Sequence, residues 1–160
     1  MENAYIKGIR MTTTEGKAQE NIGNVTEMLS ESGYAEEAIS YFLKKENMGS
    51  LPDANQVTEL TGPCGDTMKI FMNIDKKNII QDAKIQVLGC PCAIASAMAA
   101  MDLIRGKSID DVTGIKDRDI FKMLVDIPDQ KQHCIQITSR TIQKAIEEYK
   151  EKLNKKAERV

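Results

Sequence analysis

A strand-like pattern gives way to a helical one within the stretch Leu88-Gly89-Cys90-Pro91-Cys92-Ala93-Ile94-Ala95-Ser96. Two of the chain's four cysteines lie here, separated by a proline, preceded by a glycine and followed by small residues. Thiols at the start of a helix face free backbone N–H groups and the positive end of the helix dipole, which favour the thiolate. Because the thiolate binds metals and carries sulfur, we expect other reactive residues to converge on this stretch.

Two alternating patterns precede this stretch and predict an antiparallel hairpin. In residues 68–74 apolar and polar side chains alternate, and residues 79–87 continue with a second alternating pattern. Between them, Asp75-Lys76-Lys77-Asn78 has the composition of a turn. Residues 57–60 form a third, shorter strand candidate.

Helical spacing predicts the remaining elements, which comprise residues 34–42, 92–104, 108–112, 117–124 and 135–153. Gly106 is placed to end the second of these helices, and Ser108 to cap the third. The order of a helix, strands and then several helices predicts an α+β fold. We expect a small three-stranded antiparallel sheet with several helices packed on one face.

Composition divides the chain into three parts. Residues 1–33 are polar and weakly periodic, which predicts a loosely ordered N-terminal extension containing at most a short helix over residues 24–29. Residues 34–153 are expected to form the folded domain. Residues 154–160 are expected to form a solvated tail.

Charge and apolar content exclude several classes of partner. The net charge is −2, aromatic residues make up 4% of the chain and tryptophan is absent, so the composition does not favour binding to nucleic acid. No apolar run approaches the length of a membrane span. The N-terminus lacks the apolar core of a signal peptide and carries several acidic residues, so we predict a cytoplasmic protein.

Three short segments hold all the soft metal-binding side chains: residues 62–66, 89–92 and 131–134. Each lies at a junction between predicted elements, and the only histidine, His133, adjoins Cys134. In a cytosolic protein, four cysteines favour metal or sulfur chemistry over disulfides. Thiolate and imidazole donors select zinc or an iron–sulfur cluster over magnesium or calcium, and the spacing does not distinguish these two.

The same segments carry a resemblance to a known family. The motifs Cys64-Gly65-Asp66, Gly89-Cys90, Ala93-Ile94-Ala95-Ser96, Lys131 and His133-Cys134 occur in the order found in IscU/NifU-type iron–sulfur cluster assembly scaffolds. Further similarity lies in Tyr34-Ala35-Glu36-Glu37-Ala38, Asn47-Met48-Gly49-Ser50-Leu51 and Ile104-Arg105-Gly106-Lys107. The resemblance covers roughly residues 34 to 150.

The resemblance implies a set of ligands. Cys64, Cys90 and Cys134 match the family's three cysteines, His133 matches its histidine ligand, and Cys134 matches its main persulfide acceptor. Two further positions match family residues that are involved in releasing the cluster. Asp66 matches an aspartate that ligates the cluster or keeps it labile, and Lys131 matches a lysine that exchanges with the ligands.

The resemblance also implies the function and the partners. It implies a scaffold, not an enzyme, on which a labile [2Fe-2S] cluster is built and then transferred to apo iron–sulfur proteins. A cysteine desulfurase would supply sulfur as persulfide, and a ferredoxin-like donor would supply iron or electrons. Incomplete thiolate ligation suits transfer, whereas four cysteines would favour retention of the cluster.

Three features depart from the family pattern. Cys92 lies where the family usually has a small residue other than cysteine; it would replace His133 as a ligand, act as an alternate sulfur acceptor or be a buried small residue. Ile127-Pro128-Asp129-Gln130 differs from the Leu-Pro-Pro-Val that an Hsp70-type chaperone reads, which argues against chaperone-driven release. The extension over residues 1–33 has no family counterpart.

Two zinc-binding proteins are the alternatives. SufU-type sulfur acceptors share the cysteines, but they carry an insertion before the third cysteine and lack the histidine, so His133 argues against them. A zinc-stabilised binding or regulatory module would use the same ligands as a closed structural site. Zinc bound to these ligands in the isolated protein is compatible with the cluster scaffold as well as with the two zinc-binding alternatives.

Overall fold

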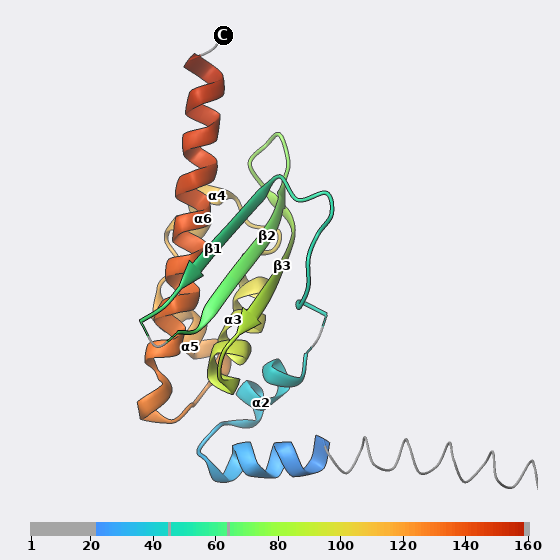
Figure 1. The fold of residues 1–160 in the computed structure, drawn as a ribbon, viewed down its shortest axis with the longest axis vertical. Helices are drawn as coiled ribbons and strands as arrows, with labels where there is room; N and C mark the ends of the chain where they lie inside the picture. The colour runs from blue at the N-terminus through green and yellow to red at the C-terminus, as the bar shows by residue number, and fades with distance from the viewer. Residues whose placement is uncertain (1–21, 45, 64, 159–160) are drawn as a thin grey trace, which may run out of the picture.

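The computed structural model describes residues 22–44, 46–63 and 65–158 (Figure 1). A helix over residues 22–31 comes first in this part of the chain. The elements that follow are α2 (Glu36–Leu43), β1 (Gln56–Thr61), β2 (Thr67–Ile74), β3 (Ile80–Leu88), α3 (Pro91–Ile104), α4 (Ile109–Thr113), α5 (Asp117–Leu124), the 3-10 helix η1 (Asp129–Lys131) and α6 (His133–Glu158).

The three strands form one antiparallel sheet in the order β1-β2-β3. Side chains alternate along β2, so that Met68, Ile70 and Met72 are fully buried on one face. The predicted hairpin is confirmed: the Asp75 carboxylate accepts hydrogen bonds from the backbone N–H groups of Lys77 (2.8 Å) and Ile79 (2.9 Å) in the turn between β2 and β3.

The helices α3, α5 and α6 lie behind the sheet in the view of Figure 1, so they cover one face of it. Most of α3 is buried, because its small alanine side chains allow close contact with β3, α2 and α6. α6 runs along β1 and β2 and extends beyond the sheet. The predicted α+β class, with a three-stranded antiparallel sheet and helices on one face, is therefore confirmed.

Several helix boundaries agree with the sequence prediction. α3 begins at Pro91 with Cys90 as its N-cap, and the Ser108 hydroxyl caps α4 by accepting a hydrogen bond from the Asp111 N–H (3.1 Å). α6 begins at His133, two residues before the predicted start, because the chain enters it directly from η1. α6 continues through most of residues 154–160, which the sequence assigned to a solvated tail, and its side chains there are exposed.

The chain before α2 is helical over residues 22–31, where the sequence predicted at most a short helix over residues 24–29. Leu29 is buried in the core, and the Ala35 N–H donates a hydrogen bond to the Asp126 carbonyl (3.0 Å), so this segment is attached to the domain. The prediction for residues 1–21 lies outside the described residues. Among the helices of residues 22–158 that the structure describes, none combines the length and apolar character needed to cross a membrane.

Candidate metal centre

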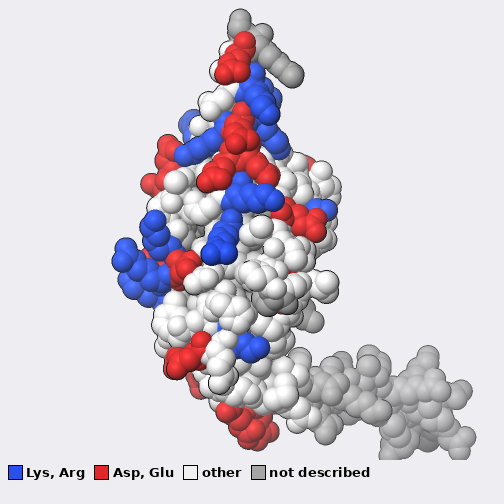
Figure 2. Space-filling view, turned by 60° about the vertical axis from the view of Figure 1, so that its left-hand side comes forward, with Lys and Arg blue, Asp and Glu red and all other residues white. Residues whose placement is uncertain are grey.

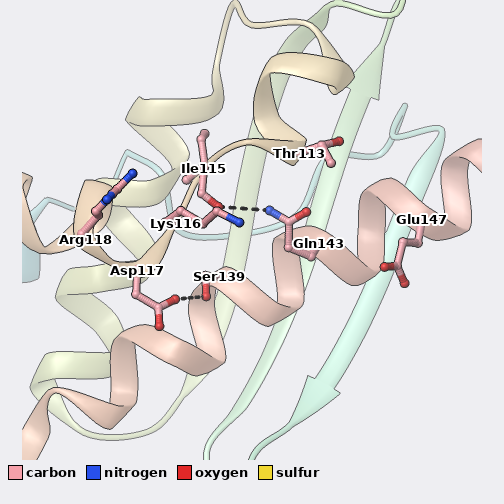
Figure 3. A pocket seen from close by; sticks show the side chains of 8 residues that line it. All are labelled: Thr113, Ile115, Lys116, Asp117, Arg118, Ser139, Gln143 and Glu147. Carbon is pink, nitrogen blue, oxygen red and sulfur yellow. Dashed lines mark hydrogen bonds between the residues drawn. The ribbon is translucent and has the colours of Figure 1, made fainter.

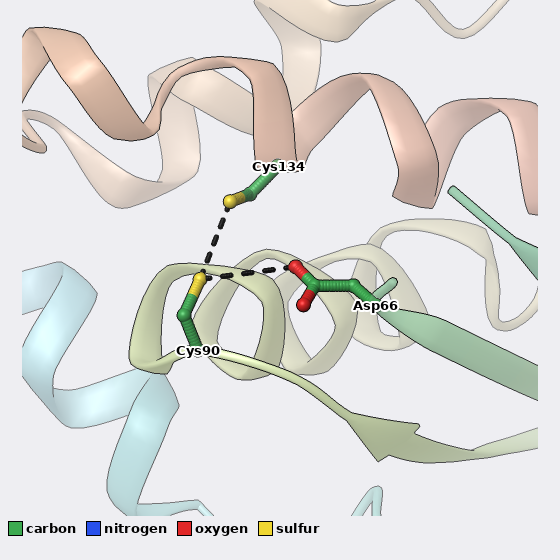
Figure 4. A group of neighbouring side chains, drawn as sticks. All are labelled: Asp66, Cys90 and Cys134. Carbon is green, nitrogen blue, oxygen red and sulfur yellow. Dashed lines mark hydrogen bonds between the residues drawn. The ribbon is translucent and has the colours of Figure 1, made fainter. Parts of the chain in front are cut away.

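Asp66, Cys90 and Cys134 meet at one end of the sheet, although 24 and 44 residues separate them along the chain (Figure 4). One potential ligand atom from each residue lies within 4.8 Å of the other two. The Cys90 and Cys134 Sγ atoms are 3.3 Å apart, and Cys90 Sγ lies 4.0 Å from Asp66 Oδ2. Two thiols and a carboxylate at this separation can bind one soft or borderline metal ion.

The turn between β1 and β2 positions Asp66. The Gly62 N–H donates to the Asp66 carbonyl (2.8 Å), and the Gly65 N–H donates to the Gly62 carbonyl (3.0 Å). Gly65 has a φ of 87°, a conformation that side-chain-bearing residues rarely adopt. The glycines of this loop therefore set the direction in which the carboxylate points.

Gly89 allows the Asp66 carboxylate to approach Cys90. A Cβ atom at Gly89 would lie 2.8 Å from Asp66 Cγ and 3.2 Å from the Ala93 Cβ. These distances are shorter than van der Waals contact, so only glycine leaves room for the carboxylate. A glycine is thus required here by close packing at the site.

Burial distinguishes the two thiols. Cys90 is partly exposed at the N-cap of α3, whereas Cys134, in the first turn of α6, is 1% exposed. Burial raises the pKa of the Cys134 thiol well above its ordinary value, and the hydrogen bond with Cys90 and nearby negative groups raise it further. Without a metal or another cation, Cys134 is therefore a protonated thiol at neutral pH, and metal binding would release its proton.

His133 contacts this group at its edge. Its ring is exposed, and its Nε2 atom lies 3.7 Å from Cys134 Sγ. His133 does not share the mutual 4.8 Å spacing of Asp66, Cys90 and Cys134. The third predicted cysteine ligand, Cys64, lies outside the described residues.

Cys92 points into the protein. It is 0% exposed, and its thiol donates a hydrogen bond to the Lys131 carbonyl (3.2 Å) at the end of η1. Burial raises its pKa to about 12, with the neighbouring Cys90 contributing. Of the three alternatives left open by the sequence, this placement favours a buried small residue, here one that connects α3 to the segment preceding His133.

Tyr34 is close to the site, although the family resemblance assigns no role there to the motif that contains it. Burial raises the pKa of its hydroxyl to about 12, and the neighbouring Cys92, Cys90 and Cys134 add to the increase. A hydrogen bond with the Cys92 backbone acts in the opposite direction. The hydroxyl therefore lies near the Cys92 backbone at the start of α3, a placement that a one-dimensional apolar pattern does not reveal.

A hollow of about 570 Å³ lies elsewhere, between α6 and the chain from the end of α4 into α5 (Figure 3). Two of the polar side chains lining it have partners: Asp117 accepts a hydrogen bond from Ser139, and the Gln143 amide donates to the Ile115 carbonyl (3.3 Å). On the face shown in Figure 2, basic and acidic side chains alternate along α6. Neither feature matches the soft donor chemistry of Asp66, Cys90 and Cys134.

Comparison of the sequence with known proteins gives consistent matches. The profile of the family described as "NifU-like N terminal domain" matches residues 33–156. The Drosophila melanogaster "Iron-sulfur cluster assembly enzyme IscU" is 38% identical over 128 residues, which cover 77% of this chain and 82% of that protein. The Escherichia coli "Iron-sulfur cluster assembly scaffold protein IscU" is 35% identical over 123 residues, covering 74% of this chain and 95% of that protein.

Solved structures with the same fold include the N-terminal part of a NifU-like protein from Brucella abortus. Its TM-score is 0.62 at 16% identity, over 74% of this chain and 94% of that chain. A putative iron–sulfur cluster assembly scaffold for the SUF system from Fervidobacterium islandicum gives 0.56 at 20% identity, over 71% and 96% of the two chains. At these identities the similarity bears on the fold alone.

Proposed function

The chain belongs to the NifU-like N-terminal domain family, and on this premise we propose that it is a scaffold for assembling iron–sulfur clusters. The observation that carries the proposal is the convergence of Asp66, Cys90 and Cys134 from three separate segments within 4.8 Å. The cluster is cargo that leaves the protein, so the protein is a carrier, not an enzyme. Sulfur activation belongs to a partner.

The proposed cargo is a [2Fe-2S] cluster. Cys90 and Cys134 supply thiolates for iron, and Asp66 supplies a harder and weaker oxygen ligand. By family resemblance, Cys64 and His133 complete the ligand set. A mixed donor set of this kind retains a cluster less firmly than four thiolates, which suits transfer.

The proposed partners follow from the chemistry of assembly. A cysteine desulfurase delivers sulfur as a persulfide to Cys134, a ferredoxin-like donor supplies iron or electrons, and apo iron–sulfur proteins receive the cluster. Lys131 and Asp66 are the proposed exchange residues during release. The cytoplasmic location predicted from composition belongs to the same proposal.

Zinc binding is the second candidate function. The same Asp66, Cys90 and Cys134 atoms suit a tetrahedral zinc ion completed by His133, whose Nε2 lies 3.7 Å from Cys134 Sγ. A zinc-dependent sulfur acceptor of the SufU type or a zinc-stabilised module would use this site. The histidine beside Cys134 favours the scaffold.

Anaerobic reconstitution distinguishes the two functions. The apo-protein is incubated with ferrous iron, cysteine and a cysteine desulfurase, and visible charge-transfer absorption and transfer to an apo-ferredoxin are followed. The scaffold proposal predicts a coloured protein that loses its cluster to the acceptor, and Cys134→Ser should abolish the absorption while Cys92→Ser retains it. A colourless protein with one tightly bound zinc ion and no transfer would favour the zinc function.

A further inference from the structure

We propose that Cys90 is the resolving thiol for a persulfide carried by Cys134, releasing its outer sulfur as hydrosulfide. The inference rests on the scaffold function proposed above and specifies how sulfide is generated at the site. It assigns Cys90 a chemical step in addition to metal ligation. The juxtaposition of the two sulfur atoms, not the presence of either cysteine alone, carries the argument.

The distance between the thiols suits direct attack. The Cys90 and Cys134 Sγ atoms are 3.3 Å apart, within the range of about 3–3.5 Å expected for reacting atoms before bond formation. In a Cys134 persulfide, the atom at this distance from Cys90 is the inner sulfur, which remains bonded to Cβ. Attack on the inner sulfur expels the outer one, whereas attack on the outer sulfur would only move the persulfide.

The step balances as a thiol–disulfide exchange. The Cys90 thiolate forms a bond to the inner sulfur of Cys134, the bond between inner and outer sulfur breaks, and the outer sulfur leaves as HS⁻ with the bonding electron pair. The sulfane sulfur is reduced by two electrons, and the two cysteine sulfurs are oxidised to a Cys90–Cys134 disulfide. A dithiol or an electron-donor protein then returns two electrons and the cysteines regain two protons.

Asp66 provides a route for the proton of the attacking thiol. Cys90 Sγ donates a hydrogen bond toward Asp66 Oδ2 at 4.0 Å, so the carboxylate is the oxygen acceptor that faces this thiol among the three site residues. The thiolate needed for the attack is the form that exchanges with disulfide sulfur. Gly89 preserves this approach, because a Cβ atom there would collide with the Asp66 carboxyl group.

Contact and exposure make Cys90 the thiol placed to act on Cys134. Cys134 is 1% exposed, whereas Cys90 is in contact with its Sγ atom and partly exposed. Hydrosulfide released between Cys90 and Asp66 appears beside the ligands that would bind iron. The same pair of residues would therefore couple sulfide production to the place of cluster assembly.

The test measures sulfide and disulfide in the full-length apo-protein, without iron and without added reductant. One arm loads sulfur with a cysteine desulfurase and cysteine, and the other uses sodium tetrasulfide followed by rapid desalting. Sulfide is trapped with monobromobimane, and intact and peptide masses report persulfide and disulfide. We expect about one sulfide per loaded protein, with a Cys90–Cys134 cross-linked peptide.

Matched variants separate the resolving thiol from the other cysteines. Cys90→Ser should retain the +32 Da persulfide on Cys134 and release sulfide at least tenfold more slowly, whereas Cys92→Ser should release it as the unmodified protein does. Serine is suited to the N-cap of α3, where Cys90 makes no side-chain capping hydrogen bond, so the variant should fold. Circular dichroism and thermal unfolding check this.

The two proposals fail in different ways. Sulfide release that is unchanged in Cys90→Ser, or that is lost in Cys92→Ser instead, overturns the assignment of Cys90. Tetrasulfide loading that yields sulfide and the cross-link, while the desulfurase loads no sulfur, supports the resolving step and contradicts the proposed desulfurase partner. Persulfide that persists on Cys134 in the unmodified protein, in either arm, overturns the resolving step and leaves the scaffold function standing.

Discussion

Gly89 is the residue at which packing and site chemistry are most closely linked. It lies between the last residue of β3 and the N-cap of α3, and the Asp66 carboxyl group occupies the space that a side chain would need. The absence of a Cβ atom therefore allows a carboxylate and a thiol from two different segments to approach each other. Its requirement is steric, since its φ is not in the positive range.

Gly89→Ala should weaken metal binding more than it weakens the fold. The new Cβ would lie 2.8 Å from Asp66 Cγ and would displace the carboxylate, so we expect zinc affinity to fall roughly tenfold. Overpacking should lower the free energy of unfolding by about 1–3 kcal/mol. Competitive zinc titration and urea unfolding measure the two effects.

Gly23→Ala is the matched control, because nothing lies within 4 Å of a Cβ atom at this position in the first described helix. It should leave zinc affinity unchanged and raise stability by about 0.5–1 kcal/mol. Equal zinc affinities for Gly89→Ala and the unmodified protein would show that Asp66 does not contribute to the site.

The side chain of Cys92 points in a different direction from that of Cys90, although only one residue separates them. Its thiol is buried and donates to the Lys131 carbonyl, so Cys92→Ala should lower the free energy of unfolding by about 1–2 kcal/mol through the lost hydrogen bond and a small cavity. Cys92→Ser restores a donor and should recover part of this loss. Urea unfolding gives the values.

Metal stoichiometry distinguishes this structural role from ligation. Both Cys92 variants should bind one zinc ion with unchanged affinity, because Cys92 is not part of the group formed by Asp66, Cys90 and Cys134. A cobalt-substituted Cys92→Ser protein with a weakened thiolate-to-metal absorption band would instead identify Cys92 as a ligand.

At the level of elements, a polar cluster connects α2, α3 and β3 at the C-terminal end of α3. Asp102 on α3 accepts hydrogen bonds from Lys44, from Asn47 (2.9 Å) and from Arg105 (3.2 Å). Arg105 also donates to the Ala83 carbonyl (2.9 Å) on β3. Since α3 carries Cys90 at its N-terminus, this cluster fixes the element on which the site depends.

Asp102→Asn should destabilise the protein in a pH-dependent way. Burial alone would raise the pKa of Asp102, but hydrogen bonds from Lys44, Asn47 and Arg105 outweigh it and lower the pKa below 3.8. A lowered carboxyl pKa contributes stability above the unfolded-state value, and that contribution is lost as pH falls through the folded-state value. We expect a loss of about 2–3 kcal/mol at pH 7 that shrinks below about pH 4.

Urea unfolding at pH 7 and pH 3 tests this prediction, with Asp110→Asn as the control. The Asp110 side chain is 85% exposed, so its replacement should change stability by less than about 0.5 kcal/mol at either pH. A loss for Asp102→Asn that is the same at both pH values would mean that the charge of Asp102 does not contribute.

For the whole molecule, the site connects three parts of the chain. Asp66 precedes β2, Cys90 caps α3 and Cys134 lies in α6, so a bound ion would cross-link the sheet to two helices. A ligand that binds only the folded state stabilises it by about 2.7 kcal/mol at one hundred times its Kd. Metal occupancy should therefore affect global unfolding as well as the local loops.

Zinc at one hundred times its Kd should raise the Tm by about 5–10 °C relative to protein in EDTA. Differential scanning calorimetry measures the shift, and Cys90→Ser/Cys134→Ser is expected to lose most of it. An equal zinc-dependent shift in this double variant would place the stabilising ion elsewhere.

Local sequence determined the elements and several of their boundaries. Alternation over residues 68–74 and 79–87, with turn residues between them, predicts the hairpin because side chains in a strand project to opposite faces. Pro91 and Ser108 likewise fix helix starts through their own backbone chemistry. These signals act over a few residues, so they can be read from the linear sequence. The family motifs additionally indicate which cysteines are candidate ligands.

Only the tertiary structure decided which of these side chains meet. Asp66, Cys90 and Cys134 converge because packing of α3 and α6 against the sheet brings distant segments together. Adjacent residues on a helix point about 100° apart, so Cys134 faces the site while His133 remains exposed. Cys92, two residues after Cys90, is buried, whereas Cys90 is partly exposed. Sequence spacing cannot specify this rotation, because the position of each helix on the sheet depends on long-range packing of the core.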